Sequence, residues 1–152
     1  MISPNRSKDK KMHKEKYTGY NFTEITVNLS AEALVWLSGT TRDNADKPFR
    51  NFNFFLSLLK EMRTDTGLDT RFRRPIELDP LDVQFSEISL AQKWNLGRKK
   101  MHNLLMKMEA LGLIEVTNRR VGSWLSFKCV SKWRDDRESK EQSLSQDPPL
   151  NR

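Results

Sequence analysis

The spacing of apolar residues divides this chain into short strands and amphipathic helices. Apolar residues at every second position predict strands, and apolar residues at intervals of three and four predict helices. The predicted strands are Ile25–Leu29, Val83–Phe85, Leu113–Thr117 and Trp124–Val130. The predicted helices are Ala31–Ser38, Phe49–Arg63, Glu87–Trp94 and Arg98–Leu111. We therefore expect an α+β fold that is mostly helical.

The longest predicted helix follows Pro48, a residue that the first turn of a helix tolerates. The apolar residues on one face of this helix are Phe52, Phe55, Leu56, Leu59 and Met62, and Phe54 and Leu58 widen that face. A row of aromatic residues could line a ligand pocket, but core packing is the commoner use of such a row. We expect this helix to be the central core element, and we predict no small-molecule ligand.

Four segments lack apolar periodicity. Residues 1–18 form a lysine-rich arm and residues 134–152 a tail of mixed charge, and both are expected to be disordered. Residues 40–47 are polar and are expected to form a loop. Residues 64–80 are expected to form a long connection, which contains Arg71, Arg73 and Arg74.

The charge balance favours a polyanionic partner. Lys and Arg number 27 against 20 Asp and Glu, which gives a formal net charge of +7. Such a charge suits nucleic acid or an acidic membrane surface. No apolar run is long enough to cross a bilayer, and no apolar segment follows the basic N-terminus as in a secretory signal. With Cys129 as the sole cysteine, we expect a soluble cytoplasmic protein that holds neither a cofactor nor a metal.

The segment from Val83 to Val130 carries the candidate function. Ser86 can cap the helix Glu87–Trp94, and Asn95-Leu96-Gly97 forms a tight turn into the helix Arg98–Leu111. The predicted buried stripe of this second helix is Met101, Leu104, Leu105, Met108 and Leu111. Gly112 ends the helix, and two strands with a turn between them follow.

The surface predicted for this segment is basic. Residues 88–108 contain no acidic residue but carry Lys93, Arg98, Lys99, Lys100 and Lys107. An exposed helix face usually mixes both signs of charge, so a face of one sign favours a phosphate backbone as partner. The hairpin over residues 117–124 has Arg119 and Arg120 at its turn. We expect the basic face and this hairpin to lie on the same side of the molecule.

These residues resemble the bacterial winged helix-turn-helix superfamily. The resemblance covers about a third of the chain, and its motifs are Ser89-Leu90-Ala91, Leu96-Gly97-Arg98, Met101, Leu105, Met108 and Leu111-Gly112-Leu113-Ile114. A looser resemblance extends back to Pro48 and includes Ile76-Glu77-Leu78-Asp79-Pro80. This looser resemblance is to replication-organiser and regulator proteins of phages, plasmids and other mobile elements. The resemblance implies a winged helix over residues 48–132. It does not extend to residues 20–47, which the apolar pattern predicts to be a strand-helix extension.

The resemblance also implies roles for individual residues in binding double-stranded DNA. The helix Arg98–Leu111 would lie in the major groove, with candidates for base edges or flanking phosphates at Arg98, Lys99, His102 and Asn103. Phosphate contacts would come from Lys93, Lys100 and Lys107, and Arg119 and Arg120 would enter the minor groove or contact the backbone. Gly97 stands where the family often has Ser or Thr, which removes a side-chain cap.

Three further questions stay open at this point. The chain could be a protein-interaction module that uses Trp124, Trp133 and the strand Ile25–Leu29. It could form a homodimer through that strand and the helix Ala31–Ser38, or these elements could complete its own core. An enzyme is disfavoured because neither His13 nor His102 has a carboxylate pair or clustered ligands beside it in the sequence.

Overall fold

The computed structural model describes residues 18–136 and 140–143, so the predicted basic arm of residues 1–18 lies almost entirely outside the described residues. Helix and strand each make up about 30%, with four helices in the described part of the chain. The expectation of a mostly helical protein was therefore wrong. The excess of strand comes from short hairpins and edge strands in segments that were expected to be loop or tail.

A helix is present at each of the four predicted places, although the one expected over residues 49–63 is shorter than predicted. These helices are α2 (Ala31–Leu37), α3 (Asn51–Leu59), α4 (Glu87–Lys93) and α5 (Arg98–Ala110). The strands are β1 (Glu24–Val27), β2 (Thr40–Arg42), β3 (Pro48–Arg50), β4 (Gly67–Leu68), β5 (Glu77–Leu78), β6 (Asp82–Phe85), β7 (Ile114–Arg119), β8 (Gly122–Phe127), β9 (Val130–Asp135) and β10 (Lys140–Ser143). None of the helices in residues 18–136 and 140–143 is long and apolar enough to cross a membrane.

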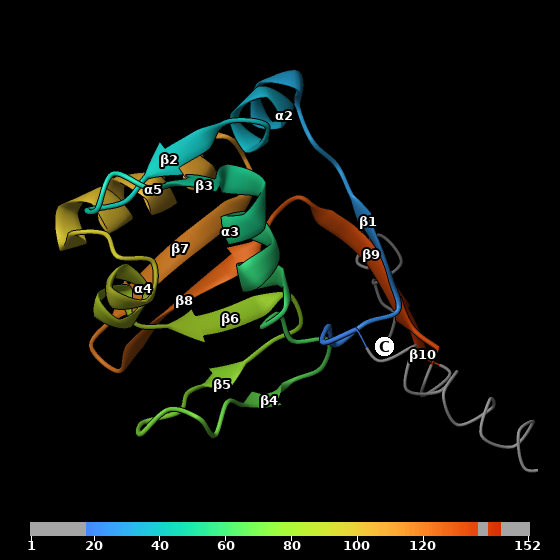
Figure 1. Cartoon of the computed structure of the whole chain (residues 1–152). Coiled ribbons are helices and arrows are strands. Elements are labelled where there is room, and N and C mark those ends of the chain that lie inside the picture. The colour runs from blue at the N-terminus through green and yellow to red at the C-terminus, as the bar shows by residue number, and fades with distance from the viewer. Residues whose placement is uncertain (1–17, 137–139, 144–152) are drawn as a thin grey trace, which may run out of the picture.

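The main body is a three-stranded antiparallel sheet with helices packed against it. Its strand order is β6-β8-β7, and α3, α4 and α5 cover it in Figure 1. The core between these layers is fully buried at Phe54, Met101, Leu105, Leu125 and Phe127. Burial of this much apolar surface is the main stabilising contribution to the body. The predicted succession of strand, helix, turn, helix and hairpin is present as β6, α4, α5, β7 and β8.

A second antiparallel sheet, of order β1-β9-β10, extends away from the body (Figure 1). Strand β1 pairs with β9, so Ile25 lies opposite Trp133 and Glu24 opposite Arg134. Trp133 is only 3% exposed. The expected disordered tail was wrong for residues 134, 135 and 140–143, which belong to β9 and β10 and pair with each other.

In the polar segment 40–47 the loop prediction was wrong for residues 40–42, which form β2 and pair with β3, whereas residues 43–47 form the turn between the two strands. Thr41 pairs with Phe49 across this hairpin, and Pro48 is the first residue of β3 instead of the start of a helix. The ring of Phe49 packs against Trp94 at the end of α4, with the two centroids 4.9 Å apart. Strand β3 is thus paired with β2 and packed on α4 through an aromatic contact, and α3 begins only at Asn51.

Helix α3 is shorter than expected and its core face is rotated. It ends at Leu59, although Met62 is still fully buried just beyond it. Phe54, Phe55 and Leu58 face the core, whereas Phe52 is 43% exposed, so its predicted place in the core was wrong. The predicted connection of residues 64–80 contains the short strands β4 and β5, which pair with each other.

Candidate nucleic-acid interface

The turn between α4 and α5 has the geometry that its sequence predicts. Asn95 adopts a left-handed conformation with φ of +54°, and Leu96 is 5% exposed beneath the turn. Ser86 caps α4 by accepting a hydrogen bond from the Ser89 N–H at 3.2 Å. Gly97, the N-cap residue of α5, has no side chain that could accept a hydrogen bond. The first backbone N–H groups of α5 therefore have no side-chain cap.

Helix α5 buries one face and exposes the other. Met101, Leu104, Leu105 and Met108 are buried, as predicted, and Leu111 at the C-cap is half-buried. The exposed residues of this helix include every predicted candidate on it, namely Arg98, Lys99, Lys100, His102, Asn103 and Lys107. Lys99 and Asn103, four residues apart, lie on the side opposite the buried stripe.

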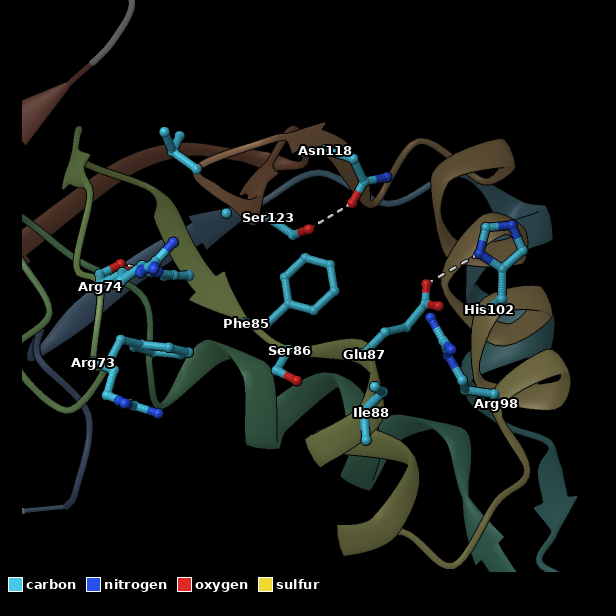
Figure 2. Close-up of a pocket in the computed structure, with 14 residues that line it drawn as sticks. Arg73, Arg74, Phe85, Ser86, Glu87, Ile88, Arg98, His102, Asn118 and Ser123 are labelled. Atoms are coloured by element: carbon cyan, nitrogen blue, oxygen red, sulfur yellow. Dashed lines mark hydrogen bonds and ion pairs between the residues drawn. The ribbon is translucent and has the colours of Figure 1, made fainter.

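A groove of about 750 Å3 separates the N-terminal end of α5 from the β7–β8 hairpin. Figure 2 shows Arg98 and His102 of α5 on one side of this groove and Asn118 and Ser123 of the hairpin at another. The hairpin is held closed there, because the Ser123 hydroxyl donates to Asn118 Oδ1 at 2.6 Å. The basic helix and the arginine-bearing hairpin therefore border one groove.

The arginines in or beside this groove lack ion pairs within the described residues, whereas four of the five other described arginines have them. Away from the groove, ion pairs with carboxylates involve Arg42, Arg63, Arg71 and Arg134. Within residues 18–136, no ion pair involves the arginines in or beside the groove, which are Arg73, Arg74, Arg98, Arg119 and Arg120. Arg50, which lies outside the groove, is also without an ion pair there. The groove is thus bordered by cationic groups that the described protein does not neutralise.

One carboxylate does line the groove. Glu87, the first residue of α4, places Oε2 3.0 Å from Nδ1 of His102 (Figure 2). The stretch without acidic residues, 88–108, begins immediately after Glu87 in the sequence. The predicted one-signed basic face therefore did not take this carboxylate into account. The His102 side chain is half exposed and lines the groove, but one of its two ring nitrogens is in contact with a carboxylate oxygen.

Three of the predicted phosphate contacts lie elsewhere. Lys100 donates from Nζ to the carbonyl oxygen of Arg42 at 2.7 Å, which fastens the β2–β3 hairpin to α5. Lys93 lines a separate pocket between α4 and the segment 57–72. Lys107 lines a shallow depression beside α2, together with Val35 and Trp36. The structure therefore gathers Arg98, His102 and the hairpin, and separates these three lysines from the groove.

Arg73 and Arg74 are the cationic groove residues to which the sequence analysis gave no role. They belong to the connection between β4 and β5, and both line the groove. The sequence shows them as two adjacent arginines in an aperiodic segment. Such a segment carries no helical or strand period from which its direction could be predicted, so only the fold brings these arginines to the groove.

Other candidate chemistry is sparse in the described part of the chain. No group of three or more His, Cys, Asp or Glu side chains there could hold a metal ion. Cys129 is 3% exposed, and burial raises the pKa of its thiol to about 11. Burial also raises the pKa of the Asp82 carboxyl, which accepts a hydrogen bond from the Asp79 N–H.

The residues proposed for a protein-interaction surface are used within the protein. Trp133 is buried, Trp124 is half-buried, and one edge of β1 is paired with β9. In α2, Ala33 and Leu37 are buried in the core.

No family model, curated protein or solved structure gives a significant match to this chain. The functional interpretation consequently depends on the geometry and charge of the groove.

Proposed function

We propose that this protein binds double-stranded DNA, with α5 in the major groove and the β7–β8 hairpin against the backbone. The observation that carries this proposal is the set of arginines around the groove that lack ion pairs within the described chain. Such cations lower the free energy of binding by releasing counterions condensed on DNA. Lys99 and Asn103, on the outer side of α5, are the residues that would reach base edges.

The length of α5 is suitable for this role. Its 13 residues span about 20 Å at 1.5 Å per residue, and the major groove of DNA accepts an α-helix. Gly97 leaves the first N–H groups of α5 without a side-chain partner, which favours an anion near that end. The resemblance of residues 89–114 to bacterial helix-turn-helix proteins supports a role in transcription regulation or as a replication accessory protein of a mobile element.

The test is a salt titration of binding to a fluorescent random-sequence duplex. The wild-type protein is expected to bind at low salt, with an affinity that falls linearly on logarithmic axes as salt rises. The triple variant Arg98→Glu, Lys99→Glu, Arg119→Glu is expected to bind about 100-fold or more weakly at 0.1 M salt, since three cationic groups at the proposed interface become anionic.

A matched triple variant controls for net charge. Arg50→Glu, Lys60→Glu and Lys132→Glu change the charge equally at exposed residues that do not line the groove. This control is expected to bind much more tightly than the groove variant. Absence of wild-type binding at low salt, or equal affinities for the two triple variants, would overturn the proposal.

A further inference from the structure

The loop of residues 69–76, between β4 and β5, faces the groove from the side opposite α5. Figure 2 shows Arg73 and Arg74 together on one side and Arg98 and His102 on the other. Both arginines of the loop are exposed. A flexible loop would lose conformational entropy on binding, so its contribution depends on how firmly the protein already holds it.

The first part of this loop is fastened by Arg71 and Phe72. Arg71 forms ion pairs with Asp69 within the loop and with Glu61 just beyond α3. Phe72 is half-buried and lines both the groove and the neighbouring pocket beside α4. The residue immediately before Arg73 therefore packs on the body of the protein.

The second part of the loop is held by Gln84 of β6, which is only 6% exposed. The Gln84 amide donates from Nε2 to the carbonyl oxygen of Arg74 at 3.1 Å, and its Oε1 accepts from the Ile76 N–H at 3.3 Å. The nitrogen and the oxygen of this buried amide thus both bind the backbone of the loop. Leaving either atom unpaired in the protein interior would cost free energy. These contacts fix the backbone at Arg74 and leave both guanidinium groups unengaged by Gln84.

The β7–β8 hairpin also touches this loop. A Cβ atom at Gly122 would lie 3.4 Å from Nε2 of Gln84 and 3.7 Å from Cδ1 of Ile76. The hairpin backbone therefore approaches Gln84 and the loop closely, which places Arg119 and Arg120 on an element that packs against the one carrying Arg73 and Arg74.

We propose that the Arg73–Arg74 loop is an additional binding site for DNA phosphates, and that Gln84 is its positioning residue. This inference rests on the proposed function of the groove. The loop would contact the duplex backbone next to the hairpin, on the far side of the groove from α5. Within residues 18–136 the two arginines form no ion pair, whereas Arg71 in the same loop has two. The loop thus uses one arginine for its own structure and presents two to a ligand.

The first experiment measures the salt dependence of duplex binding for the double variant Arg73→Gln, Arg74→Gln. Each lost phosphate contact should make the slope of log affinity against log salt shallower by about 0.9, so we expect a reduction of up to about 1.8. The affinity at 0.1 M salt should fall about tenfold or more. The matched control is Lys60→Gln, Lys132→Gln, which removes the same charge at residues that do not line the groove and should retain most of the wild-type slope.

The second experiment tests Gln84 through a mutant cycle. Gln84→Met keeps the side-chain length but removes both hydrogen bonds, so we expect part of the slope reduction seen for the double arginine variant. Added to the double arginine variant, Gln84→Met should change the slope no further, because its effect acts through the arginines. Circular dichroism and thermal unfolding verify that each variant is folded.

The outcomes separate this inference from the proposed function. If the wild-type protein binds duplex DNA and the double arginine variant keeps its slope, the loop is not a phosphate site while the proposed function stands. An equal loss in the lysine control would show that only net charge matters, which also overturns the inference. An additive effect of Gln84→Met in the cycle would remove its positioning role. Absence of wild-type binding would overturn both proposals together.

Discussion

Nδ1 of His102 lies 3.0 Å from Oε2 of Glu87, which joins the second turn of α5 to the first residue of α4 inside the groove. Glu87 contributes the single carboxylate among the described residues that line this groove. A negative charge at this place opposes a phosphate backbone, and the contact with His102 holds this carboxylate against α5.

Substitutions at this pair should shift DNA affinity in opposite directions. Glu87→Gln removes the opposing charge and is expected to strengthen duplex binding about two- to fivefold at 0.1 M salt, the range of an exposed charge interaction of up to about 1 kcal/mol. His102→Asn leaves Glu87 without its partner and is expected to weaken binding by a similar factor. Fluorescence anisotropy with the same duplex measures both. Weaker binding by Glu87→Gln would contradict this account.

Lys99 and Lys100 are adjacent in sequence but should respond differently to substitution. Lys100 donates to the Arg42 carbonyl, so Lys100→Met should lower the free energy of unfolding by up to about 1 kcal/mol. Lys99 makes no such contact within the described chain, and Lys99→Met should leave stability unchanged while reducing the salt slope of DNA binding more than Lys100→Met does. Urea unfolding and the salt titration together distinguish the two residues. Identical behaviour in both assays would refute the distinction.

Gly97 offers a test of the missing cap on α5. The backbone there has φ of −70° and ψ of 161°, which any residue adopts, and a Cβ atom at this position would lie within 4 Å of no residue other than its chain neighbours. Gly97→Ser should therefore be more stable than Gly97→Ala by about 0.5–2 kcal/mol, because the hydroxyl can accept a hydrogen bond from the first turn. Chemical denaturation of the two variants measures the difference. Equal stabilities would mean that the serine forms no cap.

Asp82 should give the protein a distinct pH dependence of stability. Because burial raises the pKa of this carboxyl in the folded state above its ordinary value of 3.8, the folded protein binds the proton more strongly than the unfolded chain. The contribution of Asp82 to the free energy of unfolding should therefore fall as pH rises from about 3.8 through the folded pKa, and stay low above it.

The variant Asp82→Asn should lack this contribution. It keeps an oxygen that can accept from the Asp79 N–H but carries no charge, so it should be at least as stable as the wild type at neutral pH. Unfolding in urea across pH 3–7 compares the two proteins. A larger loss of stability for Asp82→Asn at pH 7 than at pH 3 would contradict the burial explanation.

Local signals in the amino-acid order were enough to predict several elements. The stripe from Met101 to Met108 predicted α5, because residues three and four apart share one face of a helix. Asn95 and Gly112, with φ of +54° and +77°, predicted the turn into α5 and its end, because few other residues adopt such backbone angles easily. These features depend on neighbours within a few residues, and the structure contains them where the pattern placed them.

Features that depend on distant partners emerged only from the packing of the folded chain. Pro48 is part of a strand because it pairs with Arg42 of β2, and residue 134 is part of β9 because it pairs with Glu24. The same applies to the groove. Packing between distant segments allows Lys100 to donate a hydrogen bond to the Arg42 carbonyl, and it places Arg73 and Arg74 opposite α5. Strand pairing and side-chain direction in aperiodic segments are set by contacts between residues far apart in the chain, and no local period encodes them.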